Sequence, residues 1–136
     1  MKAISHFLVI VSIVLSSCSN KPEFSKDYVQ GSWECYDYTM NDVEMNDADV
    51  AQIRETMRTS TFTFDDSVLY IQNPYLKLAF TCEFNTQENT IVYTQLHNEQ
   101  VAPSFFTVVD FTPNTMVLMQ SYPGSEARTF LQRAAK

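Results

Sequence analysis

Residues 77–84 read Lys77-Leu78-Ala79-Phe80-Thr81-Cys82-Glu83-Phe84, and this stretch decides the fold class. Its large apolar side chains occupy alternate positions: Leu78, Phe80, Cys82 and Phe84. Because successive side chains of a strand point to opposite faces, one face here is apolar and the other is mainly polar. The pattern predicts an antiparallel β-strand with one side on a core and the other side in water.

Similar segments lie on both sides of this stretch, rich in Thr, Val, Tyr and Phe and separated by turn formers such as Pro113-Asn114. The predicted strands are Ser32–Thr39, Thr59–Asp65, Val68–Ile71, Leu76–Phe84, Thr90–Leu96, Phe105–Phe111, Met116–Gln120 and Arg128–Arg133. Eight short strands in series predict an eight-stranded antiparallel up-and-down barrel, or a sandwich. The fold class is therefore all-β, with one short helix.

The helix is predicted over Asp47–Arg58, between the first two strands. Val50, Ile53 and Met57 fall on one face at helical spacing. Asn46 is a suitable N-cap, because its side chain can accept a hydrogen bond from a free backbone N–H of the first turn.

The N-terminus has the layout of a secretory signal, with Lys2, an apolar run over residues 7–15 and small residues before Cys18. The run is shorter than the roughly 20 residues of a transmembrane helix. Leu15-Ser16-Ser17-Cys18 resembles the lipobox of bacterial lipoproteins, which implies cleavage before Cys18 and lipidation of that residue.

We therefore expect a signal peptide at 1–17, a lipidated cysteine and tether at 18–27, and one domain at 28–136. Two or more acyl chains anchor a protein stably in a bilayer. In enteric bacteria, an aspartate directly after the lipidated cysteine resembles a signal for retention in the inner membrane. This chain has Ser19 at that position. The expected location is the cell envelope, with the lipid in the outer membrane.

Composition argues against several function classes. The formal net charge is −7, and nucleic-acid binding requires clustered Lys and Arg. Two glycines cannot build a loop that cradles phosphate. After cleavage at Cys18, His97 is the one remaining histidine, and it lies beside a polar turn. We expect a binding protein without nucleic-acid partners, cofactors or catalytic residues.

The segment Tyr28-Val29-Gln30-Gly31-Ser32-Trp33 resembles the start of the lipocalin-like, or calycin, families, whose first strand opens with Gly-x-Trp. The resemblance is to small lipocalin-like lipoproteins of Bacteroidetes. It implies that Trp33 packs across the closed end of a barrel, with Arg133 of the last strand over the indole. A guanidinium over an indole gains about 0.5–2 kcal/mol from the cation–π interaction. Gly31, Trp33 and Arg133 are thus the expected structural residues.

The barrel interior is the candidate binding site. Strand parity places Phe62, Phe64, Leu78 and Phe80 on inward faces. Asp37 shares parity with Trp33, so it is expected to point inward as a polar anchor for a ligand, or as a hydrogen-bonded buried carboxylate. An eight-stranded barrel can instead fill itself with side chains.

Cys35 and Cys82 also have inward parity. An exported protein meets an oxidising compartment, so the two form a disulfide or remain as inert buried thiols. The acidic stretch Asp42–Asp49 lacks the glycine of common calcium loops, and helix capping accounts for its carboxylates, so no metal site is expected.

Two functions remain after these exclusions. The first is a membrane-anchored envelope lipoprotein that binds a small apolar ligand inside the barrel. The alternative is an interaction, inhibitor or accessory module that binds an envelope protein through its loops or through an exposed face carrying Tyr36 and Tyr38.

Overall fold

The computed structural model describes residues 23–98 and 100–136. Two helices and eight strands follow one another along the chain. They are α1 (Lys26–Val29), β1 (Gly31–Asp42), α2 (Asp47–Arg58), β2 (Thr61–Asp65), β3 (Val68–Gln72), β4 (Lys77–Asn85), β5 (Thr90–Gln95), β6 (Ser104–Phe111), β7 (Thr115–Tyr122) and β8 (Ser125–Arg133).

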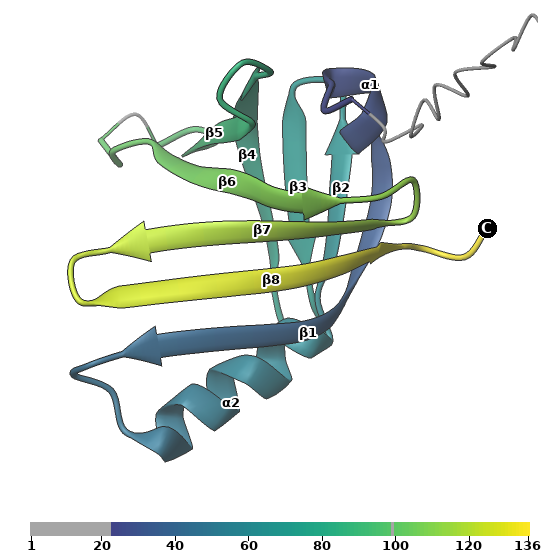
Figure 1. The fold of residues 1–136 in the computed structure, drawn as a ribbon. Helices are drawn as coiled ribbons and strands as arrows, with labels where there is room; N and C mark the ends of the chain where they lie inside the picture. The colour runs from purple at the N-terminus through teal and green to yellow at the C-terminus, as the bar shows by residue number, and fades with distance from the viewer. Residues whose placement is uncertain (1–22, 99) are drawn as a thin grey trace, which may run out of the picture.

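The strands form a closed antiparallel barrel in sequence order, and β1 pairs with both β2 and β8 (Figure 1). The predicted up-and-down barrel is confirmed, and the sandwich is excluded because the ladder closes. Each predicted strand is present with its ends shifted by a few residues. Figure 1 shows β6, β7 and β8 running across the direction of β2 and β3, so the barrel is strongly twisted.

Alternation along the strands builds the core. In β2, Phe62 and Phe64 are buried while their neighbours are at least partly exposed. The same period places Leu69, Cys82, Ile91, Phe106, Met116, Leu118 and Leu131 in the interior. Apolar side chains at alternate positions along the strands therefore give the barrel most of its core.

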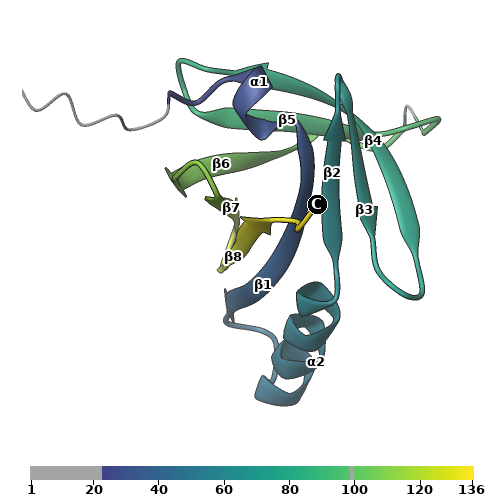
Figure 2. The same cartoon turned by 90° about the vertical axis from the view of Figure 1, so that its right-hand side faces the viewer.

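The connections fall into two groups at opposite ends of the barrel. The plug end carries α1, the start of β1, the end of β8 and the turns around residues 66–67, 86–89 and 112–114. The helix end carries α2 and the loops around residues 43–46, 73–76, 96–103 and 123–124. Both views show α1 and α2 at opposite ends of the molecule (Figures 1 and 2).

Helix α2 begins and ends as predicted. The Asn46 side chain accepts a hydrogen bond from the backbone N–H of Asp49 at 2.9 Å. None of its residues is fully buried, although Ile53 and Met57 pack against the core. The helix thus covers the rim of the barrel beside β1 and stays outside the core.

Helix α1 was not predicted. Ser25 caps its N-terminus, accepting from the backbone N–H of Tyr28, and Val29 is fully buried. Phe24 is buried as well and packs edge-on against Phe111. Packing against the barrel therefore starts within the stretch 18–27 assigned to the tether. Residues 1–22, which include the predicted signal peptide and Cys18, lie outside the described residues.

Two strands contain a β-bulge that changes side-chain parity. In β1, Cys35 pairs with Leu131 but Asp37 pairs with Phe130, so Tyr36 is an extra residue. In β6, Val109 is the extra residue between Val108 and Asp110. Beyond each bulge the faces are exchanged relative to a simple alternation.

Candidate functional site

A cavity of about 260 Å³ lies inside the barrel at the helix end. It lies beneath Met57 of α2 and reaches residues of seven strands, β2 to β8. Its lining is Met57, Ser60, Phe62, Ile71, Asn73, Leu76, Leu78, Phe80, Tyr93, Phe106, Gln120 and Thr129. The volume lies just under the roughly 300–1,000 Å³ of typical ligand pockets, so the site suits a small molecule.

An aromatic wall forms one side of the cavity. The Tyr93 and Phe106 rings stack with centroids 4.6 Å apart and an interplanar angle of 19°. Phe80 meets Tyr93 edge-on at 5.3 Å, and Phe62 meets Phe106 edge-on at 6.4 Å. Such offset and edge-to-face pairs fix the orientation of each ring. The aromatic wall is therefore a firm apolar surface.

A polar wall, consisting of Gln120 on β7 and Thr129 on β8, adjoins the aromatic wall, because β7 pairs with β6. The Gln120 amide donates hydrogen bonds to the phenol oxygens of Tyr93 and of Tyr122, the second at 3.0 Å. Thr129 is 2% exposed, and its side chain reaches the cavity. The cavity thus combines an apolar side with two uncharged polar groups.

Burial raises the pKa of the Tyr93 phenol to about 12. A neutral phenol inside the barrel is the lower-energy form because an ionised oxygen would lose its hydration there. Tyr93 is therefore a neutral hydrogen-bonding group of the cavity over the physiological pH range.

Three of the four apolar side chains predicted to face a ligand line the cavity: Phe62, Leu78 and Phe80. The fourth, Phe64, is buried nearer the plug end and packs against Phe84 at 6.2 Å. Phe64 lies two residues after Phe62 on β2, so the interior is already filled by side chains at this level of the barrel.

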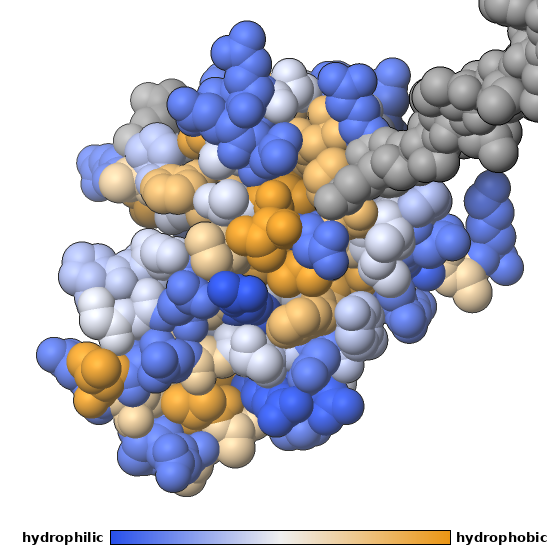
Figure 3. Space-filling view, in the orientation of Figure 1, coloured by the Kyte–Doolittle hydropathy of each residue, from blue (hydrophilic) through white to orange (hydrophobic). Residues whose placement is uncertain are grey.

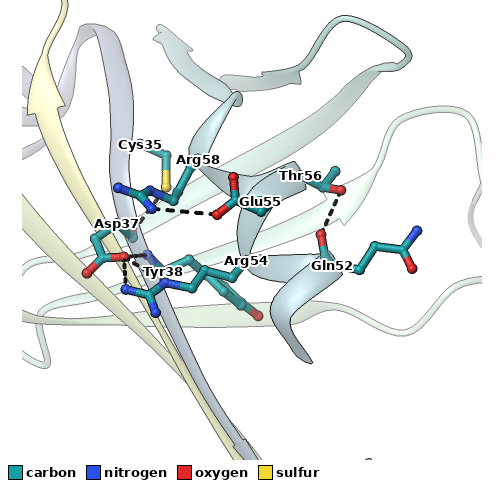
Figure 4. A network of polar contacts seen from close by, with 8 residues as sticks. All are labelled: Cys35, Asp37, Tyr38, Gln52, Arg54, Glu55, Thr56 and Arg58. Atoms are coloured by element: carbon teal, nitrogen blue, oxygen red, sulfur yellow. Dashed lines mark hydrogen bonds and ion pairs between the residues drawn. The ribbon is translucent and has the colours of Figure 1, made fainter. Parts of the chain in front are cut away.

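The prediction that Asp37 points into the barrel is wrong. The bulge at Tyr36 places Asp37 beside Phe130, which lies between the buried residues Thr129 and Leu131 and hence on the outer face. There the Asp37 carboxylate accepts two hydrogen bonds from Arg54 of α2, at 2.9 and 3.1 Å (Figure 4). Asp37 links β1 to α2 and does not line the cavity.

The Arg54 hydrogen bonds lower the pKa of the Asp37 carboxyl, and a further bond from the backbone N–H of Tyr38 acts in the same direction. Next to this pair, Arg58 lies 3.6 Å from Glu55 on the same helix (Figure 4). Both ion pairs are at least partly exposed to solvent, so each contributes little to the stability of the fold. Of the two, the Asp37–Arg54 pair alone links α2 to β1.

The prediction that Tyr36 and Tyr38 lie together on an exposed face is wrong for Tyr38. Tyr36 is exposed and packs against Phe130, but Tyr38 is buried beyond the bulge. Because of the bulge, the positions of these two residues are the reverse of those predicted: Tyr38 lies inside the barrel and Asp37 lies outside.

Cys35 and Cys82 are buried free thiols. The two cysteines are therefore buried thiols in this structure and do not form a disulfide. Burial raises the pKa of each thiol to about 11, and the Cys35 thiol donates to the backbone carbonyl of Asp37. Because the thiolate is the reactive form, both side chains act as small apolar core residues.

The plug end has the arrangement that the lipocalin-like resemblance implies. Trp33 is fully buried, and its indole N–H donates to the carbonyl of Val29 at 2.9 Å. The Arg133 guanidinium lies 4.1 Å from the indole ring centre and donates to the carbonyls of Tyr28, Gln30 and Pro113. Gly31 has a φ of +104°, which only glycine adopts readily, so Trp33 is fixed just beyond this turn.

His97 is exposed in the turn after β5. In the acidic stretch, Asn46 and Asp42 accept backbone hydrogen bonds, and no group of three metal-binding side chains occurs among the described residues. Within those residues there is also no helix with the length and apolar character that a bilayer span requires.

Five lining residues of the cavity that carry polar groups were not predicted from the sequence: Ser60, Asn73, Tyr93, Gln120 and Thr129. A signal for the last two was present. Gln120 has the parity of the buried residue Leu118, and Thr129 that of Leu131. A polar side chain at an inward position is the mark of a polar site inside a barrel.

Comparison with known proteins gives no match to a family model and none to a curated protein. A solved structure of a DUF4847 family protein from Bacteroides vulgatus is similar to this chain, with a TM-score of 0.49 and 9% sequence identity. The superposition covers 80% of this chain and 96% of that chain. At this identity the similarity carries no information on function.

Proposed function

We propose that this protein is a lipid-anchored binding protein of the bacterial cell envelope, whose barrel holds a small, largely apolar ligand at the helix end. The observation that carries the proposal is the cavity of about 260 Å³, which aromatic side chains and the polar side chains of Gln120 and Thr129 line together. Side chains that line an empty cavity lack van der Waals contacts on that side, and a bound ligand would supply those contacts.

The lining supports binding and gives no support to catalysis. It consists of aromatic and aliphatic side chains with a few hydroxyl and amide groups, the composition of a ligand pocket. General acid–base chemistry needs a group that exchanges protons near neutral pH. The lining tyrosine, with its pKa raised to about 12, does not meet that need.

The anchoring part of the proposal rests on the sequence before residue 23. Cys18 follows an apolar run and resembles the lipobox cysteine, which would place the protein in the envelope with its lipid in the outer membrane. Labelling cells with a radioactive fatty acid tests this. We expect label in the wild type and none in Cys18→Ser, and equal label in both would contradict anchoring at this residue.

Binding is tested with an environment-sensitive apolar dye and the variant Leu78→Trp. The dye should bind the native wild-type chain, and the larger indole should block binding by filling the cavity. Overpacking costs about 1–3 kcal/mol, so folding of the variant is checked by circular dichroism. If the native protein binds no dye and Leu78→Trp only destabilises it, the interior is not a binding site.

A second candidate function, docking of an envelope protein, is favoured by exposed apolar side chains on the outer face. Val92 of β5 and Phe105 of β6 are cross-strand partners, and both are exposed. Figure 3 shows apolar surface gathered over β6 and β7 with polar surface around it. If this face is the site, Phe105→Ser should abolish cross-linking to an envelope protein while dye binding inside the barrel stays unchanged.

A further inference from the structure

We infer that the ligand is a neutral molecule with a compact apolar ring body and one hydroxyl group, which the polar wall of Gln120 and Thr129 holds. This inference rests on the proposed binding function and names the class of ligand for the same cavity. Four properties of the cavity lead to it: charge, hydrogen-bonding capacity, geometry and size.

The first property is the absence of charge. Among the described residues, every side chain that lines the cavity is apolar, hydroxyl-bearing or an amide, so none is a carboxylate or a cationic group. A charged ligand buried there would lose its hydration without gaining a counter-ion, which is strongly unfavourable. The cavity therefore selects neutral molecules.

The second property is the unused hydrogen-bonding capacity of the polar wall. The Gln120 amide nitrogen already has two phenol oxygens as partners, but no described group donates to its carbonyl oxygen. The Thr129 hydroxyl makes none of the hydrogen bonds found among the described residues, and its side chain lines the cavity. Both groups line the cavity, so their free hydrogen-bonding capacity is open to a ligand there.

The third property is the position of these groups relative to each other. Thr129 pairs with Leu118 and Gln120 pairs with Ala127, so the two side chains are diagonal neighbours on the inner face of β7 and β8. Diagonal neighbours are close enough to contact one group together. A ligand hydroxyl can donate to the Gln120 carbonyl and accept from the Thr129 hydroxyl at the same time.

The aromatic wall determines the other half of the ligand. Phe62, Phe80 and Phe106 face the interior from β2, β4 and β6, and β6 is the direct neighbour of β7. Flat rings held in fixed orientations favour a planar apolar partner, which they can meet face to face or edge to face. The ligand body is therefore a planar ring system.

The fourth property is size. A dry cavity of about 150 Å³ accommodates benzene, so by proportion about 260 Å³ accommodates roughly ten non-hydrogen atoms. A two-ring alcohol such as 2-naphthol has this size. Its neutral hydroxyl and its planar body satisfy the other three properties as well.

Three probes of similar shape test the inference on the purified full chain carrying Cys18→Ser, which removes the predicted lipid. They are 2-naphthol, 2-methylnaphthalene and 2-naphthoate. We expect 2-naphthol to bind about tenfold more tightly than 2-methylnaphthalene, because one to two hydrogen bonds separate them. The carboxylate of 2-naphthoate should prevent measurable binding.

Two substitutions locate the effect. Thr129→Val replaces a hydroxyl by a methyl group and should weaken 2-naphthol binding about fivefold, the value of one neutral hydrogen bond. It should leave 2-methylnaphthalene binding unchanged. Combining it with Gln120→Met should abolish the preference for the alcohol. Thr107→Val, on the outer face of β6, is the matched control and should keep the full preference.

The outcomes separate the inference from the function on which it rests. If 2-naphthol and 2-methylnaphthalene bind equally, or if 2-naphthoate binds best, the inference is wrong while a binding cavity remains. If no probe binds the native chain, the binding function fails and the inference fails with it. Should Thr129→Val not fold, the ranking of the three probes on the unsubstituted barrel decides the question.

Discussion

The two ends of this barrel differ in how their space is used. At the plug end, Trp33 fills the interior and Arg133 joins three backbone carbonyls over it. At the helix end, α2 lies over a cavity and has no fully buried residue. The interior is thus filled by side chains at the plug end and keeps a cavity at the helix end.

The connecting loops differ in the same way. The plug-end turns carry polar side chains such as Asp66, Asn85 and Asn114. The helix end carries the exposed apolar side chains Val43, Tyr75, Leu76, Val101 and Tyr122. Leu76 also lines the cavity, so the apolar surface continues from the loops into the interior.

The largest effect on stability is expected at the plug end. Trp33→Ala should lower the free energy of unfolding by about 3–5 kcal/mol, the range for removing a large buried aromatic side chain. Denaturant unfolding followed by far-UV circular dichroism measures this, because the variant lacks the tryptophan itself. A loss below about 1 kcal/mol, as at surface sites, would show that the plug end does not carry the stability.

A smaller effect is expected at the helix end. Ile53→Ala on α2 should cost about 1 kcal/mol, well under the 2–5 kcal/mol of a fully buried position, because Ile53 is only half-buried. Gln52→Ala on the exposed side of α2 is the control and should change stability by less than about 0.5 kcal/mol. A cost for Ile53→Ala equal to that of Trp33→Ala would remove the contrast between the two ends.

The smallest effect concerns the ion pair that links β1 to α2. Because Arg54 lowers the pKa of Asp37 in the folded state, its contribution is present above the ordinary pKa of 3.8 and is lost as the pH falls through the folded-state pKa. Asp37→Asn should therefore be slightly less stable than the wild type at neutral pH. The difference should vanish in acid, and urea melts over a pH series measure it. If the stability difference between the wild type and Asp37→Asn persists or grows in acid, the difference does not come from the Asp37–Arg54 pair.

Much of the fold follows from local sequence. Alternation at Leu78, Phe80 and Cys82 predicts an inward face, and Asn46 before an apolar stripe predicts the start of α2. Both predictions are confirmed. The closure of β1 on β8, which decides between barrel and sandwich, depends on twist and stagger over the whole sheet.

The candidate site was predictable only in part. Phe62, Leu78 and Phe80 follow from parity, because no bulge interrupts β2 or β4. Asp37 was misplaced because the extra residue Tyr36 changes parity, and nothing in the local sequence marks a bulge there. Whether the interior is filled or empty depends on the summed volumes of side chains from many strands, which no single segment determines.

The interior of the barrel is filled at the plug end and hollow at the helix end. A crystal structure of the protein under xenon pressure tests it most directly, since xenon enters apolar cavities. We expect xenon density between Phe62, Phe80 and Phe106, and none beneath Trp33. Absence of xenon from the helix end, or density at the plug end, would contradict the account.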